Sequence, residues 1–324
     1  MDSLPQEIIS LIGMDLNQRD YQNLILSSLY FNTQQQYISF DKFKQFIKGF
    51  EKTNEKYFVF NYSIISYNDI IFLAKNKCYY HCEKILKSSN NIEKIIDDNT
   101  FNTLCKYSHI ESVKFLISIP FIDPSTEDNY AIRYASENGR FKLVKILLGD
   151  ESVDPSADDN YAICYASANG HFKTVKVLLA NKRVDPSAND NYAICYASAN
   201  GHSETVKVLL ANKKVDPSAD YNYSIRIASA NGHSESVKVL LANKRVDPSA
   251  NDNHAIRIAS EYGHSETVKV LLANKRVDPS ANDNYAICIA SANGHFNIVR
   301  LLFGNPNFSH SAMTMVIKNK INTK

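Results

Sequence analysis

The chain has 324 residues, of which 44% are hydrophobic and 22% charged, a composition typical of folded rather than disordered proteins. Its formal net charge of +2 gives no strong overall attraction to nucleic acid or to an anionic membrane. No stretch approaches the roughly 20 apolar residues of a membrane-spanning helix, so we expect no membrane contact. The N-terminus shows no basic leader before an apolar run. The six cysteines therefore predict reduced thiols in the cytoplasm, with the nucleus as a second location.

Residues 1–62 are expected to form a small helical N-terminal region. Pro5 suits the first turn of a helix, and apolar residues then recur with helical spacing. The stretch 3–32 resembles an F-box in its order of Leu-Pro, Ile, Leu and Asp residues. F-box helices dock onto the linker protein of cullin-type ubiquitin ligases, so the resemblance implies that protein as a partner. The implied docking residues are Leu4, Pro5, Ile8, Ile12, Leu16 and Leu24.

A purely structural role for the same residues stays open. The F-box family often carries Trp near the end of its motif, and this chain contains no Trp. Short amphipathic helices at this position would also shield the first unit of the array that follows. The alternative to an F-box is therefore a helical cap without a partner of its own.

The rest of the chain is dominated by an internal repeat. The dipeptide Asp-Pro begins at positions 123, 154, 185, 216, 247 and 278, a constant step of 31 residues. A fixed period of this size predicts a stack of similar units, each of which buries its apolar face against the next. Residues 66–127 hold two degenerate units, 128–313 hold six regular ones, and 314–324 are expected to form a partial closing helix.

The unit at 159–189 illustrates the expected structure. Its first helix is expected to begin through side-chain capping by Asp159 or Asn160, and to end at Gly170, which tolerates a left-handed conformation. A second helix follows, with Val175 and Leu178 on its apolar face. The Asp-Pro loop then breaks the helical pattern. Each unit is thus predicted to be a helix, a tight turn, a second helix and an extended loop.

The sequence "ASANGHFKTVKVLLANKRVD" in this unit resembles the core pattern of ankyrin repeats. The resemblance implies an all-α fold, an ankyrin-type helix-turn-helix repeat solenoid with a small helical N-terminal cap. The unit departs from the family's usual 33 residues, and it lacks the Thr and His that open the family's first helix. We therefore expect short fingers, the loops that project between units, and a helix start held by Asp or Asn caps and by Tyr packing.

The ankyrin resemblance implies a non-catalytic scaffold that binds a protein partner through the concave face of the solenoid, formed by the fingers and first helices. Position by position, candidates fall at the start and the end of each first helix. Glu137, Glu261 and Tyr262 depart from the usual residues at their positions, so specificity is expected there. The other partner-binding candidates are Tyr130, Asn160, Tyr161, Asn169, Asn191, Tyr192, Asn200, Asn222, Tyr223, Asn231, Asn253, Asn284 and Tyr285.

The repeated His and Cys residues do not predict a metal, cofactor or catalytic site. A His follows Gly in five successive turns, but neighbouring units should lie about 10 Å apart, too far to share one ion. We expect these His side chains to bond to backbone. Cys164 and Cys195 occupy a position that other units fill with Arg, which predicts partial exposure. Cys78, His81 and Cys82 lack a second ligand pair and are expected to be structural.

A repeated basic pair leaves a weaker alternative open. Lys182-Arg183 and its copies recur in four loops and could attract a phosphate backbone. Asp185 and its copies lie close by and offset this charge. Nucleic-acid binding is therefore the less favoured function, and no known catalytic motif supports an enzyme.

Overall fold

The computed structural model describes residues 97–107, 110–306 and 308. These residues form 14 helices and no strand, which confirms the all-α prediction. The chain divides into two compact units, Met1–Pro124 and Ser125–Lys324. Among the described residues, no helix has the length and apolar character needed to cross a membrane.

The helices of the described chain follow one another in pairs. In the first unit the pair is α6 (Asp98–Lys106) and α7 (Ile110–Ile117). The second unit holds six pairs, here called hairpins 1 to 6 in chain order. They are α8 (Thr126–Glu137) with α9 (Phe141–Leu147), α10 (Ala157–Ala168) with α11 (Phe172–Leu179), α12 (Ala188–Ala199) with α13 (Ser203–Leu210), α14 (Ala219–Ala230) with α15 (Ser234–Leu241), α16 (Ala250–Glu261) with α17 (Ser265–Leu272), and α18 (Ala281–Ala292) with α19 (Phe296–Phe303).

The α6–α7 pair of the first unit begins with a well-formed cap. The backbone N–H of Thr100 donates to Asp97 Oδ1 at 2.8 Å, and the Asp97 N–H donates back to Thr100 Oγ1 at 3.2 Å. This reciprocal pair satisfies donors that the first helical turn would otherwise leave free. Val113 and Leu116 are fully buried in this pair.

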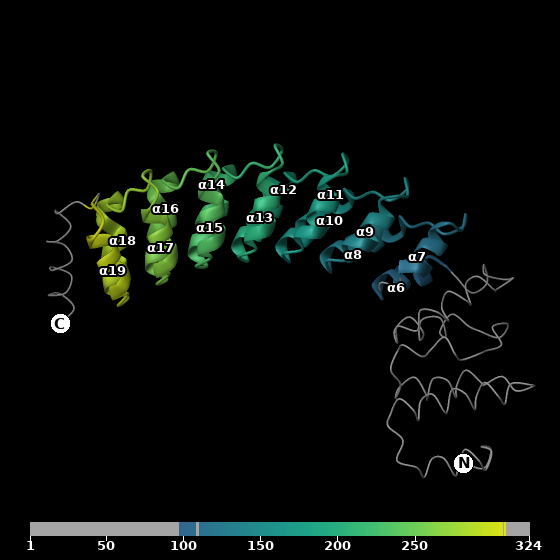
Figure 1. Cartoon of the computed structure of the whole chain (residues 1–324), viewed down its shortest axis with the longest axis horizontal. Coiled ribbons are helices and arrows are strands. Elements are labelled where there is room, and N and C mark those ends of the chain that lie inside the picture. The colour runs from purple at the N-terminus through teal and green to yellow at the C-terminus, as the bar shows by residue number, and fades with distance from the viewer. Residues whose placement is uncertain (1–96, 108–109, 307, 309–324) are drawn as a thin grey trace, which may run out of the picture. The chain divides into compact units, whose positions relative to one another are not determined.

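In the second unit, each hairpin packs against the next, first helix to first helix and second helix to second helix. Figure 1 shows the hairpins side by side, with the Asp-Pro loops along one edge and the tight turns along the opposite edge. Each first helix therefore runs from the loop edge to the turn edge. This arrangement is the nearest-neighbour stacking predicted from the 31-residue period.

The core of the stack is a repeated set of small and branched apolar residues. Ala162, Ile163 and Ala166 of α10 and Val175 and Leu178 of α11 have 0% relative exposure. Their counterparts in the other hairpins are also buried, except Val299 of α19, which is partly exposed. Small residues let neighbouring first helices approach closely, while branched residues fill the space between the two helices of a pair. The amphipathic pattern of the sequence is thus the packing pattern of the stack.

The start of each first helix differs from the prediction. Asp158, Asp159 and Asn160 all have positive φ, between 53° and 63°, so regular right-handed helix begins only at Tyr161. No side chain caps this end. The capping prediction is therefore wrong, although the position of the helix start is close to the predicted one. Asn and Asp tolerate the left-handed region better than most residues, which explains their recurrence here.

Several sequence predictions fall outside the described residues. They include the N-terminal region 1–62 with the F-box-like stretch 3–32, the degenerate unit around 70–89 with Cys78, His81 and Cys82, and the closing helix at 314–324.

Candidate functional site

A hydrogen-bond ladder joins the loops of neighbouring hairpins. Asn160 Oδ1 accepts the backbone N–H of Asp185 in the next loop, at 2.7 Å. The Asp185 carboxylate in turn accepts both the N–H and the hydroxyl of Ser187, at 3.1 and 2.6 Å. These bonds lower the pKa of Asp185, with the Ser187 hydroxyl as the main cause. The same Asn-to-Asp bond, again 2.7 Å long, recurs from Asn129, Asn191, Asn222 and Asn253.

This ladder changes the role of several Asn residues that were predicted to lie on the partner-binding surface. Asn160, Asn191, Asn222, Asn253 and Asn284 have only 7–8% relative exposure. For the first four, the side-chain oxygen is occupied by the neighbouring loop. We therefore assign these four side chains to the joint between hairpins rather than to the exposed surface.

A second ladder joins the turns. His264 Nε2 lies 2.8 Å from the carbonyl oxygen of Ala230, and His295 Nε2 lies 3.0 Å from that of Glu261. A carbonyl can only accept, so Nε2 carries the proton in both cases. The imidazole also lies over the Gly of the preceding turn. A Cβ at Gly170, for example, would lie 2.6 Å from His202 Nδ1. These His side chains are thus structural, as predicted.

The Asn residues after each first helix strengthen the same turns. Their side-chain amide donates to the last carbonyl of the previous first helix, at 2.8–3.0 Å. Their side chains remain exposed at the turn edge. The residues concerned are Asn169, Asn200, Asn231 and Asn293.

A row of tyrosines crosses the outer face of the first helices in hairpins 1 to 3. The rings of Tyr161 and Tyr165 stack at 4.0 Å between centroids, and those of Tyr192 and Tyr196 at 3.8 Å. Tyr165 and Tyr192 join the two pairs at 6.2 Å. We call the row formed by Tyr130, Tyr134, Tyr161, Tyr165, Tyr192 and Tyr196 the tyrosine row.

Some side chains of the tyrosine row are exposed to solvent, and others are enclosed by their neighbours. Tyr196 is 43% exposed, whereas Tyr161 is more enclosed and donates its hydroxyl to Glu137 Oε2 at 3.2 Å. Burial, followed by the Glu137 charge, raises the pKa of Tyr161 to about 12. Tyr161 therefore stays neutral and holds Glu137 in place. The expected Tyr packing at the helix starts is present.

Two further tyrosines stand out because the other hairpins have a different residue at the same position. Tyr221 replaces an Asp in the finger of hairpin 4 and is 77% exposed, with a positive φ of 51°. Tyr262 replaces the turn Asn of hairpin 5 and is 57% exposed. Tyr262 was among the sequence candidates, but Tyr221 was not. Comparison of the aligned units would have found it.

The position shared by Cys and Arg on the first helices is more enclosed than predicted. Cys164 and Cys195 are only 3% and 6% exposed, so the predicted partial exposure is wrong for them. Cys195 Sγ lies 3.5 Å from Ser224 Oγ of the next first helix, a neighbour that the sequence of one unit cannot show. Burial raises the pKa of Cys164 to about 12, so this thiol stays protonated and unreactive. Arg133 and Arg226 also have mostly covered side chains, at 21% and 16% relative exposure.

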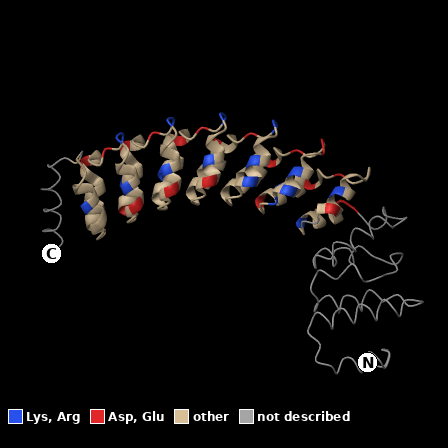
Figure 2. Cartoon of the chain, in the orientation of Figure 1, with Lys and Arg blue, Asp and Glu red and all other residues tan. Residues whose placement is uncertain are grey.

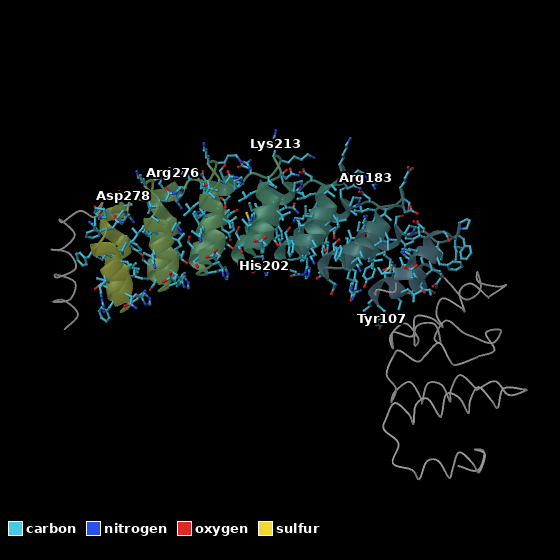
Figure 3. All side chains as sticks on the ribbon, in the orientation of Figure 1. Tyr107, Arg183, His202, Lys213, Arg276 and Asp278 are labelled. Carbon is cyan, nitrogen blue, oxygen red and sulfur yellow. The ribbon has the colours of Figure 1, made fainter. Side chains whose placement is uncertain are left out.

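The basic pairs lie on the loop edge, as Figure 2 shows, and Figure 3 places Arg183, Lys213 and Arg276 there, opposite His202 at the turn edge. Arg183 and Arg245, the second residues of two pairs, donate to backbone carbonyls of the preceding loop. Arg245 donates to the carbonyl of Val215 at 2.6 Å, and its charge lowers the pKa of Asp216, after the larger effect of the Ser218 hydrogen bonds. Positively and negatively charged side chains therefore alternate along the loop edge. Within the described ranges, no group of three or more His, Cys, Asp or Glu residues could hold a metal ion.

The comparison with protein families agrees with this architecture. Residues 132–221 and 225–313 match a family profile described as ankyrin repeats in three copies. The two matches together cover more than half of the chain. No curated protein matches the chain closely enough to count as a relative.

Proposed function

Because the chain belongs to the ankyrin-repeat family, and ankyrin repeats indicate a protein–protein interaction scaffold, we propose that it binds a protein partner through the exposed face of its first helices and turns. Ankyrin-repeat proteins are generally non-catalytic. We propose a cytoplasmic location, where the thiols of Cys164, Cys195 and Cys288, which form no disulfide in the structure, would stay reduced.

The observation that carries the proposal is the exposure of Tyr221 and Tyr262. Neither packing nor backbone geometry requires Tyr at these positions, because Asp or Asn fills them in the other hairpins. A bulky residue in the left-handed region costs roughly 1–2 kcal/mol, so Tyr221 is held at a cost to stability. Tyr262 forgoes the amide-to-carbonyl bond of the other turns. Tyrosine is a frequent anchor of protein interfaces, which explains what both exchanges provide.

The test exchanges both tyrosines for the residues found in the other hairpins. We expect the Y221D/Y262N double variant to lose at least about tenfold in affinity for partners captured by the wild-type full chain, because each aromatic anchor contributes on the order of 1–2 kcal/mol. Quantitative mass spectrometry after affinity capture measures the loss. The variant should unfold at the same or a higher urea concentration than the wild type, since both substitutions restore the common residues.

The matched control lies on a second helix. Lys173→Glu introduces the residue that hairpins 3 to 5 carry there, as in Glu204, and it should leave capture unchanged. Equal capture by the wild type and the double variant would contradict the proposed surface. A loss that Lys173→Glu shares would show a general charge effect instead.

We propose a finer role as a second candidate: a substrate receptor of a cullin-type ubiquitin ligase. Its support is the F-box-like sequence at 3–32 alone. A pulldown with the purified cullin linker protein tests it. Capture that depends on Leu4, Pro5 and Ile8 supports the receptor role, whereas absence of capture leaves the plain scaffold with a structural cap. Binding of nucleic acid through the loop edge is less well supported, because Asp216 and its copies lie beside the basic pairs.

A further inference from the structure

One position on the first helices holds Arg in hairpins 1, 4 and 5 and Cys in the other three, and the three arginines differ in their partners. It holds Arg133 in hairpin 1, where each of the three nitrogens of this side chain has a partner. Nε donates to the carbonyl of Asp128 at 2.9 Å and Nη2 to that of Glu127 at 3.1 Å. Nη1 forms an ion pair with Asp158 of the next hairpin at 2.9 Å. The charge of Arg133 is therefore neutralised within the stack.

Arg226 and Arg257 occupy the same position in hairpins 4 and 5 but form no ion pair with the described residues of the next hairpin. The residue 25 positions later, where Arg133 finds Asp158, is the neutral Asn251 for Arg226 and Asn282 for Arg257. Arg226 donates from Nη2 to the carbonyl of Asp220 at 2.9 Å and forms a longer ion pair, 3.5 Å, with the Asp220 carboxylate. Its guanidinium also lies 5.4 Å from the centre of the Tyr223 ring. Its Nε is buried without a partner among the described residues.

Arg257 is less satisfied still. Its Nε is buried and unpaired, and the described chain offers its guanidinium no hydrogen bond or ion pair. The group lies 5.4 Å from the centre of the Tyr285 ring. An unpaired buried donor costs about 1–3 kcal/mol, so both Nε groups are held in an unfavourable state. Because each Nε is enclosed, an acceptor outside the stack can reach only the Nη groups of the same guanidinium.

His254 adds a third unsatisfied group between the two arginines. It stands where the other hairpins have Tyr, and its Nδ1 is buried without a partner in the described structure. Its pKa is lowered first by burial and then by the charges of Arg226 and Arg257, so both arginines lie within electrostatic range of its ring. His254 and Arg257 lie three residues apart on α16 and so share one helix face, and Arg226 holds the position of Arg257 on α14, which packs against α16. The three groups are therefore neighbours on two packed helices.

We infer that Arg226, His254 and Arg257 form an anion-binding site for a carboxylate or phosphate group on a side chain of the protein partner. A guanidinium binds such oxyanions with two parallel hydrogen bonds, and these charge-assisted bonds are about twice as strong as neutral ones. Tyr221, in the finger of the same hairpin as Arg226, and Tyr262, directly after α16, provide exposed aromatic contacts in the same two hairpins. The assignment of the anion to a protein partner rests on the proposed function, whereas the binding of an anion does not.

The test uses sodium sulfate as the probe and the Nε–Hε signals of the full-length protein in two-dimensional NMR. At constant ionic strength, we expect the Arg226 and Arg257 signals to shift and saturate with a dissociation constant of about 1–10 mM, which corresponds to two or three charge-assisted bonds. The Arg133 signal is the internal control and should not move. Shifts of equal size at all three arginines would mean weak, unspecific association and would overturn the site.

Substitutions drawn from the chain itself sharpen the test. Asn251→Asp and Asn282→Asp together introduce carboxylates where Arg133 has Asp158, in a backbone conformation that Asp158 already adopts. We expect sulfate binding to weaken at least about tenfold, because the new carboxylates would occupy the same donors. Arg257→Cys, the residue of three other hairpins, should also weaken it, and Arg133→Cys should not. Unchanged binding by the Asp double variant would reject the site.

The source of the anion is resolved by three further probes. Stronger binding of O-phosphoserine than of glutamate assigns the site to a phosphorylated partner, and the reverse order to an acidic one. A short single-stranded oligonucleotide that binds more tightly than both and requires Arg226 and Arg257 would overturn the assignment to a protein. If sulfate fails to bind while capture still depends on Tyr221 and Tyr262, the anion site is wrong and the scaffold function stands.

Discussion

At the scale of single residues, the turns depend on glycines that face the His of the next hairpin. Gly170 has a φ of 75°, and a Cβ there would lie 2.6 Å from His202 Nδ1. Gly294 has nearly the same φ, 76°, but no described heavy atom lies within 4 Å of its Cβ position. Both glycines therefore need a positive φ, but only Gly170 also faces a His side chain.

We expect Gly170→Ala to destabilise the protein more than Gly294→Ala. Both substitutions place Ala in the left-handed region, at a cost of about 1–2 kcal/mol. Only Gly170→Ala must also displace the imidazole, which adds roughly 1–3 kcal/mol of overpacking. Urea denaturation followed by circular dichroism measures both. Equal losses would show that the His does not rest on the preceding turn.

The buried Asn residues of the loops give a second prediction at this scale. Asn191→Gly keeps the positive φ of 62° accessible but removes the acceptor of the Asp216 N–H. We expect a loss of about 1–3 kcal/mol from the unpaired N–H. Asn191→Ala should cost more, because Ala adds strain in the left-handed region. If the glycine variant were as stable as the wild type, the Asn-to-Asp ladder would contribute nothing.

At the scale of elements, the His side chains that join neighbouring turns should make the stability of the stack depend on pH. Burial, the main cause, lowers the pKa of His202 below its usual 6.5. The folded state therefore disfavours the charged ring, and stability present above pH 6.5 is lost as pH falls through the folded-state pKa. We expect the urea midpoint of the wild type to fall between pH 7.5 and about pH 5. His202→Gln should reduce this dependence; an unchanged pH profile would argue against a buried neutral imidazole.

The elements also show how far the sequence alone could lead. The period, the helix-ending glycines and the apolar stripe with Val175 and Leu178 are local patterns, so the hairpins were predictable. The role of Asn160 depends on Asp185, which belongs to the next loop, and was missed. The Cys195 thiol likewise meets Ser224 of the neighbouring first helix. Interactions between units cannot be read from one unit, even when every unit is nearly the same.

The candidate surface was predictable in outline only. The Tyr at the helix starts and Tyr262 at a turn were found, but their exposure differs widely, from a Tyr161 bonded to Glu137 to a Tyr262 that is 57% exposed. The unpaired state of Arg257 follows from the absence of a carboxylate at Asn282, one hairpin away. Such a difference becomes visible only when the hairpins are compared in space.

At the scale of the whole molecule, we interpret the chain as a scaffold in which similar hairpins provide rigidity and a few residues that depart from the repeat provide recognition. Tyr221, His254 and Tyr262, which no other hairpin has at these positions, lie in hairpins 4 and 5 together with Arg226 and Arg257. The remaining hairpins extend the stack with nearly invariant contacts. A partner should therefore bind along the first helices and turns of these two hairpins, and not along the second helices.

The most direct test is site-specific photo-crosslinking in the full-length protein. The crosslinker p-benzoylphenylalanine replaces Tyr262 on the turn of hairpin 5 or, in the control, Phe296 on the second helix α19. Both positions hold aromatic residues of similar exposure, 57% and 54%, so accessibility alone should not separate them. The account predicts covalent capture of a protein partner from Tyr262 and none from Phe296. Capture from Phe296 alone, or equally from both positions, would contradict it.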